Sequence, residues 1–120
     1  MEDLTPADKA RYARHLTLPQ IGEAGQAQLK SSRVFSVGAG GLGSPALLYL
    51  AAAGVGHLTI IDDDTIERSN LQRQILHADE DVGASKAESA MQRLKQLNPS
   101  ITIDVHSVRL TSENALNLLA

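Results

Sequence analysis

Two short apolar runs predict buried strands of a parallel sheet, because such strands read as almost continuous hydrophobic stretches. The first run covers residues 34–37 and is followed by glycines, and the second covers residues 57–61 and is followed by acidic residues. In a third segment Ile101, Ile103 and Val105 alternate with polar residues, as in a strand that is buried on one face. We therefore expect three strands.

Helical segments separate these runs. Residues 44–53 are rich in Ala and Leu, which favour helices, and Gly54 supplies a stop. Residues 85–97 predict a second helix that ends at Asn98-Pro99. The apolar stripe of this helix consists of Ala87, Ala90, Met91, Leu94 and Leu97.

The two ends of the chain also show helix signals. Thr5 reads as an N-cap, and the proline and the acidic residue that follow it predict a helix through about residue 14. We interpret residues 18–25 as a connector, and residues 25–33 as containing a short helical turn. Thr111 is typical of the N-cap of a last helix, inside which the chain stops.

This order of elements predicts an α/β fold, namely the N-terminal half of a Rossmann-like, doubly wound parallel sheet with about three strands and their helices. We expect an N-terminal helical segment over residues 1–32 and the half-domain over residues 33–120. Because the strands beyond the switch point are missing, we expect the chain to be a truncated part of an enzyme. Its first strand would present an unpaired apolar edge, which soluble proteins usually cover.

Composition narrows the function classes. The chain has 120 residues, of which 42% are hydrophobic and 21% charged, as in an ordinary globular domain. A net charge of -3 offers no excess of Lys and Arg for nucleic-acid phosphates. No run resembles a membrane helix or a signal peptide, so a cytoplasmic location is expected. Cysteine is absent, which excludes disulfides, Cys-ligated zinc and a thiolate nucleophile within these residues.

The segment after the first strand matches the nucleotide-binding pattern G-x-G-x-x-G. Its glycines permit a tight turn and a close approach of the backbone to phosphate, and they are Gly38, Gly40, Gly41 and Gly43. Asp62, at the end of the second strand, can accept hydrogen bonds from ribose hydroxyls. Two alternatives stay open: a glycine turn that only packs a strand against a helix, and an Asp62 that only caps a turn. The pattern does not distinguish ATP from NAD.

A second motif, SNLQRQ at residues 69–74, follows the acidic strand end. Ser69 is a candidate cap for a short helix that presents Asn70 and Arg73. Nicotinamide-dependent dehydrogenases need no such element. The histidines lack the i, i+4 pairing of a metal site, so we assign them neither a metal nor a catalytic role; they are His15, His57, His77 and His106.

Taken in order, these motifs closely resemble those of the ThiF/MoeB/HesA superfamily, the bacterial relatives of ubiquitin-activating enzymes. The resemblance covers nearly all of the chain. Its pieces are RYARH at residues 11–15, GAGGLG, the pair Asp62 and Asp64, SNLQRQ, and VGASKA with Lys86. It implies an enzyme that uses ATP and Mg²⁺ to adenylate the C-terminal Gly-Gly carboxylate of a ubiquitin-like sulfur-carrier protein of ThiS or MoaD type, with release of pyrophosphate.

The resemblance also implies the site. ATP would lie across the glycine turn with its ribose on Asp62, and the remaining nucleotide-binding residues would be Asp64, Ser69, Asn70, Leu71, Gln72, Arg73 and Lys86. The expected catalytic residues are Arg73 and Lys86, which would neutralise charge on the α-phosphate and the leaving group, and Arg14. Arg14 matches a family arginine that reaches into the partner subunit's ATP site, which implies a homodimer. Without the resemblance, Lys86 would read as a solvated lysine at a helix start and Arg14 as an exposed helix-end charge.

Three departures from the family pattern leave alternatives open. Asp63 stands where relatives usually carry an apolar or aromatic residue, and its charge would weaken ATP binding unless Mg²⁺ or Arg73 offsets it. The family's later aspartate for Mg²⁺ and its later cysteines are absent. The alternatives are a non-catalytic fragment that binds nucleotide or dimerises, and a nicotinamide-dependent oxidoreductase, which leaves SNLQRQ and Lys86 unexplained. The pathway stays open among molybdenum cofactor, thiamine, tRNA thiolation and cysteine.

Overall fold

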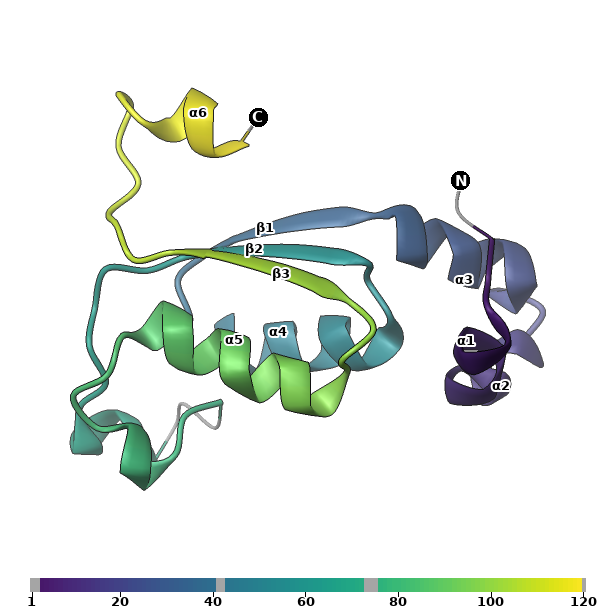
Figure 1. Ribbon diagram of the computed structural model, residues 1–120, viewed down its shortest axis with the longest axis horizontal. Coiled ribbons are helices and arrows are strands. Elements are labelled where there is room, and N and C mark those ends of the chain that lie inside the picture. The colour runs from purple at the N-terminus through teal and green to yellow at the C-terminus, as the bar shows by residue number, and fades with distance from the viewer. Residues whose placement is uncertain (1–2, 41–42, 73–75, 120) are drawn as a thin grey trace.

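The computed structural model describes residues 3–40, 43–72 and 76–119. Its centre is a sheet of three parallel strands in the spatial order β1-β2-β3 (Figure 1). The strands are β1 (Arg33–Val37), β2 (His57–Ile61) and β3 (Thr102–His106). Their register places Val34, Leu58 and Ile103 side by side. The α/β class and the three predicted strands are confirmed.

Two helices, α4 (Gly43–Ala53) and α5 (Lys86–Leu97), cover one face of the sheet (Figure 1). Each connects two parallel strands, as the crossover helix of a βαβ unit does. Alternate strand residues form the core with these helices, and its members include Leu47, Ala51, Leu58, Ile60, Ala87, Ala90, Leu94 and Ile103. The predicted stripe of α5 is confirmed up to Leu94. The prediction that Leu97 belongs to this buried stripe was wrong, because Leu97 is 41% exposed. The buried side chain at this end of the helix is Asn98.

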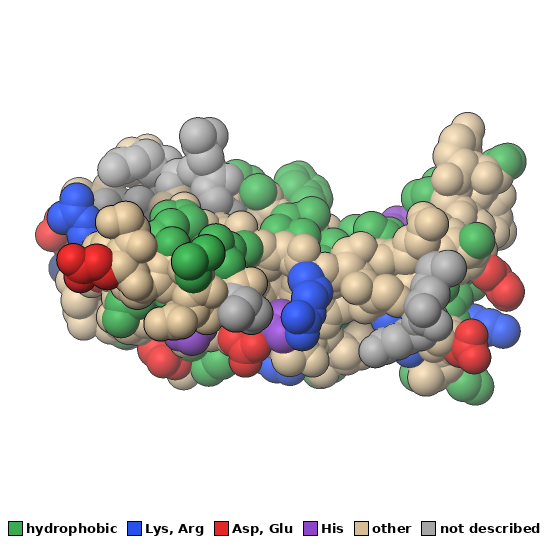
Figure 2. Space-filling model, turned by 90° about the horizontal axis from the view of Figure 1, so that it is seen from above, with side chains coloured by type: hydrophobic (Ala, Val, Ile, Leu, Met, Phe, Trp, Pro, Cys, Tyr) green, Lys and Arg blue, Asp and Glu red, His purple; other side chains and the backbone are tan. Residues whose placement is uncertain are grey.

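The opposite face of the sheet carries the polar side chains of His57, Thr59 and Asp104 beside the apolar Phe35. Helix α6 (Ala115–Leu119) lies over one end of this face (Figure 1). On this face His57 Nε2 and Asp104 Oδ2 are 2.7 Å apart. The Thr111 hydroxyl accepts the N–H of Asn114 at 3.3 Å, but it does so in a turn that precedes the last helix, which begins at Ala115. Seen from above, the molecule exposes hydrophobic side chains among polar ones (Figure 2), and Leu116 of α6 is 82% exposed.

Three helices precede the sheet: α1 (Pro6–Arg11), α2 (Ala13–Leu16) and α3 (Gly22–Ser31). Thr5 caps α1 as predicted, in a capping box with Asp8, but the helix breaks at Tyr12 instead of continuing to residue 14. The connector predicted for residues 18–25 was too long, because α3 begins at Gly22, whose φ is +56°. None of the helices within the described ranges has the length and hydrophobicity that a membrane span requires.

A buried polar network attaches these helices to the end of the sheet where its strands begin. The Tyr12 hydroxyl accepts a hydrogen bond of 2.7 Å from the Asn98 amide, which also donates to the carbonyl of Ala51 at 2.8 Å. Gln26 donates to the carbonyl of Ala53 at 2.8 Å, and its oxygen lies 2.9 Å from His15 Nδ1. Asn98 and Gln26 are fully buried. The network therefore holds the RYARH segment against the ends of α4 and α5.

Gly54 closes this network in a backbone conformation that only glycine adopts readily, with φ at +95°. A Cβ at this position would lie 2.6 Å from both Gln26 Nε2 and Tyr12 Cζ. Gly83 has a similar φ of +91°, but a Cβ there would meet nothing within 4 Å. Substitution of Gly83 therefore tests backbone strain alone, whereas substitution of Gly54 tests backbone strain together with steric overlap.

We expect Gly54→Ala to destabilise the protein more than Gly83→Ala. The left-handed backbone costs either variant about 1–2 kcal/mol, and the overlap with Tyr12 and Gln26 adds about 1–3 kcal/mol to Gly54→Ala alone. Urea denaturation of both variants measures the two losses in the free energy of unfolding. Equal losses in the free energy of unfolding would show that Tyr12 and Gln26 can move to accommodate a side chain at position 54.

Asp8 forms the main charged contact of the N-terminal helices. Its Oδ2 lies 2.8 Å from Lys30 Nζ, and this hydrogen bond is the largest cause that lowers the pKa of Asp8 below its ordinary value of 3.8, against the opposing effect of burial. Because the folded pKa is the lower one, the carboxylate stabilises the fold above pH 3.8. That stabilisation is lost as the pH falls through the lowered folded value.

Asp8→Asn should therefore destabilise the protein at neutral pH by about 1–2 kcal/mol, because it removes a charge-assisted hydrogen bond. Below pH 3.8 the difference from the unchanged protein should shrink, because the unfolded chain then binds a proton that the folded carboxylate does not, and it should be smallest once the pH is below the lowered folded pKa. Urea denaturation of both proteins at a series of pH values measures this difference. A difference that does not depend on pH would contradict the assignment.

Candidate functional site

The turn that follows β1 is tied to two other segments of the chain. Gly38, with φ at +103°, donates its N–H to the carbonyl of Ile61 in β2 at 2.7 Å. The next N–H, of Ala39, is donated to Asp62 Oδ2 at 2.8 Å. The carbonyl of Ala39 accepts a hydrogen bond of 2.9 Å from His77 Nε2. The start of the G-x-G-x-x-G segment is therefore held from both sides.

Asp62 stabilises this turn through both oxygens of its carboxylate. Oδ2 accepts the N–H of Ala39, and Oδ1 accepts the N–H of Asp64 at 2.8 Å. The capping interpretation of Asp62 therefore describes one of its roles. Each carboxylate oxygen has a second lone pair, and Asp62 is only half-buried. A ribose hydroxyl can still donate to it.

Lys86 is buried beside this strand end. Ser85 caps α5 by accepting the N–H of Glu88 at 3.3 Å, and the following Lys86 donates its own N–H to the carbonyl of Asp64 at 3.0 Å. Its side chain is 9% exposed and places Nζ 3.8 Å from Oδ2 of Asp64, whose side chain is 69% exposed. The interpretation of Lys86 as a solvated lysine is therefore wrong. A polar cavity of about 220 Å³ opens here, lined by Asp64, Thr65, Glu67 and Lys86.

The SNLQRQ segment begins in a single 3-10 turn, η1 (Arg68–Asn70). Ser69 lies inside this turn and not before it. Leu71 is half-buried and Gln72 is exposed, and for Asn70 the structure describes the backbone alone. Arg73 and Gly41, two of the predicted site residues, lie outside the described residues.

Arg14 does not join this group. It is exposed on α2, at the end of the sheet where the strands begin, whereas the glycine turn and Lys86 lie at the end where the strands finish (Figure 1). The fold therefore places one group of predicted site residues together at the end of the sheet where the strands finish: Gly38, Gly40, Asp62, Asp64 and Lys86. Arg14 lies at the opposite end.

Three consecutive carboxylates follow β2. Asp62, Asp63 and Asp64 each offer an oxygen, and these oxygens lie within 4.8 Å of one another. Carboxylate oxygens suit Mg²⁺. However, exposed acidic groups are common without a metal ion, and Asp64 faces the Lys86 ammonium. We therefore assign no metal to this cluster.

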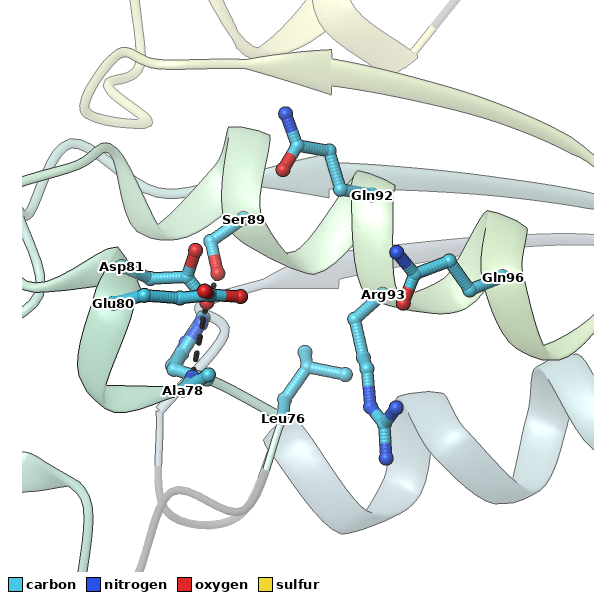
Figure 3. A pocket seen from close by; sticks show the side chains of 9 residues that line it. Leu76, Ala78, Glu80, Asp81, Ser89, Gln92, Arg93 and Gln96 are labelled. Carbon is cyan, nitrogen blue, oxygen red and sulfur yellow. Dashed lines mark hydrogen bonds between the residues drawn. The ribbon is translucent and has the colours of Figure 1, made fainter.

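No sequence pattern indicated a role for His77, which the structure places beside the glycine turn. His77 is 7% exposed, and its two ring nitrogens contact the glycine turn and Ser89 of α5. Figure 3 shows Ser89 pointing from α5 toward the segment between Leu76 and Ala78, beside a pocket of about 320 Å³. A helix pattern shows which face of α5 is buried, but it does not show that Ser89 meets a distant histidine.

A parallel sheet with a glycine turn after its first strand, a carboxylate after its second and helices on one face defines the N-terminal part of a Rossmann-like nucleotide-binding fold. The chain belongs to the ThiF family, whose model matches residues 12–120. The family resemblance drawn from the motifs is thereby confirmed.

Relatives match nearly the whole chain. The SAMP-activating enzyme E1 of Haloferax volcanii is 50% identical over 118 residues, which are 98% of this chain and 43% of that protein. The sulfur carrier protein adenylyltransferase of Thermus thermophilus is 51% identical over 96% of this chain and 42% of its own length. The adenylyltransferase and sulfurtransferase MOCS3 of Drosophila yakuba is 55% identical over 97% and 26%. The chain thus spans less than half the length of each of these relatives.

Solved structures agree with this placement. The E. coli tRNA N6-threonylcarbamoyladenosine dehydratase TcdA, in complex with ATP, superposes with a TM-score of 0.90 at 30% identity, over 98% of this chain and 48% of that chain. E. coli MccB with ATP gives a TM-score of 0.77 at 32% identity, over 89% and 33%. Structural relatives of this chain therefore bind ATP.

We expect Asp62→Asn to destabilise the turn after β1. The amide keeps one acceptor oxygen, but its NH₂ group would face the second backbone N–H, so the free energy of unfolding should fall by about 1–3 kcal/mol. Asp63→Asn, at the exposed neighbouring position, should change it by less than about 0.5 kcal/mol. Urea denaturation compares the two variants. Equal effects would mean that the two hydrogen bonds of Asp62 do not stabilise the fold.

Proposed function

We propose that the protein adenylates the C-terminal Gly-Gly carboxylate of a ubiquitin-like sulfur-carrier protein of ThiS or MoaD type, using ATP and releasing pyrophosphate. The observation that carries this proposal is the buried Lys86, whose ammonium lies at the same sheet edge as the glycine turn. A buried cation next to a turn of this kind suits a ligand that brings several negative charges. The names of the Thermus and Haloferax relatives support a protein carrier as the second substrate.

The proposed nucleotide site follows the glycine turn and the segments after β2. Asp62 accepts hydrogen bonds from the ribose, and the backbone of the turn approaches the phosphates. The other residues of the proposed site are Gly38, Gly40, Gly41, Gly43, Asp64, Ser69, Asn70, Leu71, Gln72, Arg73 and Lys86. Gly41 and Arg73 lie outside the described residues and enter the proposal from the sequence motifs and the family resemblance.

In the proposed reaction, a carboxylate oxygen of the carrier bonds to the α-phosphorus of ATP. The bond between that phosphorus and the oxygen that bridges to the β-phosphate breaks, and pyrophosphate leaves. Negative charge grows on the α-phosphate oxygens and on the leaving group, so fixed cations lower the barrier. Lys86 supplies a point charge and Arg73 a planar fork for phosphate oxygens. Mg²⁺, when bound, neutralises part of the same charge, and the family resemblance places its aspartate ligand after residue 120.

Arg14 enters the proposal through a second copy of the chain. It lies at the opposite end of the sheet from Lys86 (Figure 1), so it does not serve the site of its own subunit. A homodimer that brings α2 of one copy to the glycine turn of the other would complete the proposed catalytic residues.

Lys86→Met should slow carrier-dependent exchange of labelled pyrophosphate into ATP by about a hundredfold or more, because it removes a cation that faces the transition-state charge while keeping the stem. Lys95→Met is the control on the same helix, because Lys95 is exposed on its last turn and its ammonium donates to the carbonyl of Ile101, just before β3, at the opposite end of the helix from Lys86. Exchange by the full-length Lys86→Met protein at the control rate would remove Lys86 from the mechanism. Binding of NADH in place of ATP by the unchanged protein would favour an oxidoreductase.

A further inference from the structure

His77 is a buried histidine that the proposed reaction does not use. It follows the SNLQRQ segment and precedes η2 (Asp79–Asp81), and it is 7% exposed. Nε2 lies 2.9 Å from the carbonyl oxygen of Ala39, and Nδ1 lies 2.9 Å from the hydroxyl oxygen of Ser89 on α5. His77 therefore connects the glycine turn with the helix that carries Lys86.

The partners of His77 determine which ring nitrogen carries hydrogen. A carbonyl oxygen only accepts hydrogen bonds, so Nε2 must be the donor to Ala39. In the tautomer with hydrogen on Nε2, Nδ1 is an acceptor. The Ser89 hydroxyl can donate as well as accept, so it can donate its hydrogen to Nδ1. Ser89 is 5% exposed, so this second contact fixes the ring orientation inside the packed interface. The imidazole is held with its Nε2–H directed at the turn.

The contact with Ala39 completes a series of four successive backbone groups that each have a partner. The Gly38 N–H is bonded to Ile61, the Gly38 carbonyl accepts from the Ser36 hydroxyl at 2.9 Å, and the Ala39 N–H is bonded to Asp62. The Ala39 carbonyl, bonded to His77, is the fourth. Without His77, the last of these groups would be buried without this donor, since Ala39 is fully buried.

The next backbone group along the chain is the N–H of Gly40. A trans peptide is planar, and its carbonyl and N–H point in opposite directions. The described residues contain no cis peptide bond. Because the Ala39 carbonyl is directed at His77, the N–H of Gly40 is directed away from His77 and away from the buried side of the turn. This is the side on which a backbone N–H can meet an anion.

We propose that His77 is a positioning residue, which sets the direction of the Gly40 N–H toward the phosphates of the nucleotide by holding the Ala39 carbonyl. This inference rests on the proposed function, because it takes a phosphate-bearing nucleotide as the ligand of the turn. His77 does not touch the ligand. A histidine that only fills the core would be replaced equally well by any side chain of similar size, whereas a positioning histidine needs a donor at the place of Nε2.

Two substitutions separate these roles, because Gln places an amide N–H near the position of Nε2 and Asn places one near the position of Nδ1. His77→Gln should bind ATP within about twofold of the unchanged protein, whereas His77→Asn should bind it about fivefold more weakly or worse. Binding of adenosine, which has no phosphate, should be the same in both variants. The matched control is His57→Asn, which loses a contact with Asp104 on the other face of the sheet, and should leave ATP binding unchanged.

Affinities for ATP and adenosine are measured by titration calorimetry, and the amide resonance of Gly40 in ¹⁵N-labelled protein reports its contact with phosphate. ATP should shift this resonance in the unchanged protein and in His77→Gln but not in His77→Asn. Equal ATP affinities of the Asn and Gln variants, or equal losses for ATP and adenosine, would overturn the role of His77. A protein that binds no ATP before any substitution would instead contradict the proposed function.

The imidazole resonances of the unchanged protein test the inference without a variant. The ¹⁵N chemical shifts of His77 should show hydrogen on Nε2, which the contact with Ala39 requires. Hydrogen on Nδ1 alone would overturn the inference, because Nε2 could not then donate to the turn.

Discussion

The hydrogen bond between the Ala39 N–H and the Asp62 carboxylate joins the end of β1 to the end of β2, and the geometry of the proposed site depends on it. The two strands are parallel and in register, with Val37 beside Ile61, so the segments that leave them meet at one edge of the sheet. A carboxylate one residue beyond β2 reaches the backbone of the turn beyond β1. The same carboxylate accepts the N–H of Asp64 and so sets the direction of the chain toward Lys86.

The two ends of the sheet are built on different principles. At the end where the strands begin, a buried network of neutral polar side chains packs α1, α2 and α3 against α4 and α5. At the other end, charged groups predominate, with Asp62, Asp64 and Lys86 beside a glycine turn. Stability and proposed chemistry are thereby placed at opposite ends. A network that holds Tyr12 and His15 inward also leaves Arg14, between them in sequence, at the surface.

Much of the fold could be predicted because its signals are local. The strands follow from apolar runs, and the cap at Thr5 follows from a side chain that accepts the backbone N–H three residues ahead. α3 was underestimated because its two glycines read as a connector, whereas packing of Gln26 under Gly54 supports a helix there. Leu97 fits the helical period, but the period does not show at which residue the helix stops being covered by the rest of the protein, and Leu97 lies beyond that point.

The site was harder to predict where contacts join distant segments. The glycine turn and Asp62 carry a spacing that the sequence displays, but the burial of Lys86 arises from the return of α5 along the sheet. His77 and Ser89 are twelve residues apart and meet only because the loop after β2 folds back onto α5. Neither residue type by itself indicates such a contact, so pattern reasoning left the histidine without a role.

The pairing of a buried Lys86 with an exposed Asp64 has a kinetic consequence. Exposed side chains change rotamer within picoseconds to nanoseconds, whereas a side chain enclosed by the core keeps its place. In the proposed site a phosphate group would therefore take the place of the exposed Asp64 carboxylate beside Lys86, and the lysine would exchange one counter-ion for another without leaving its buried position.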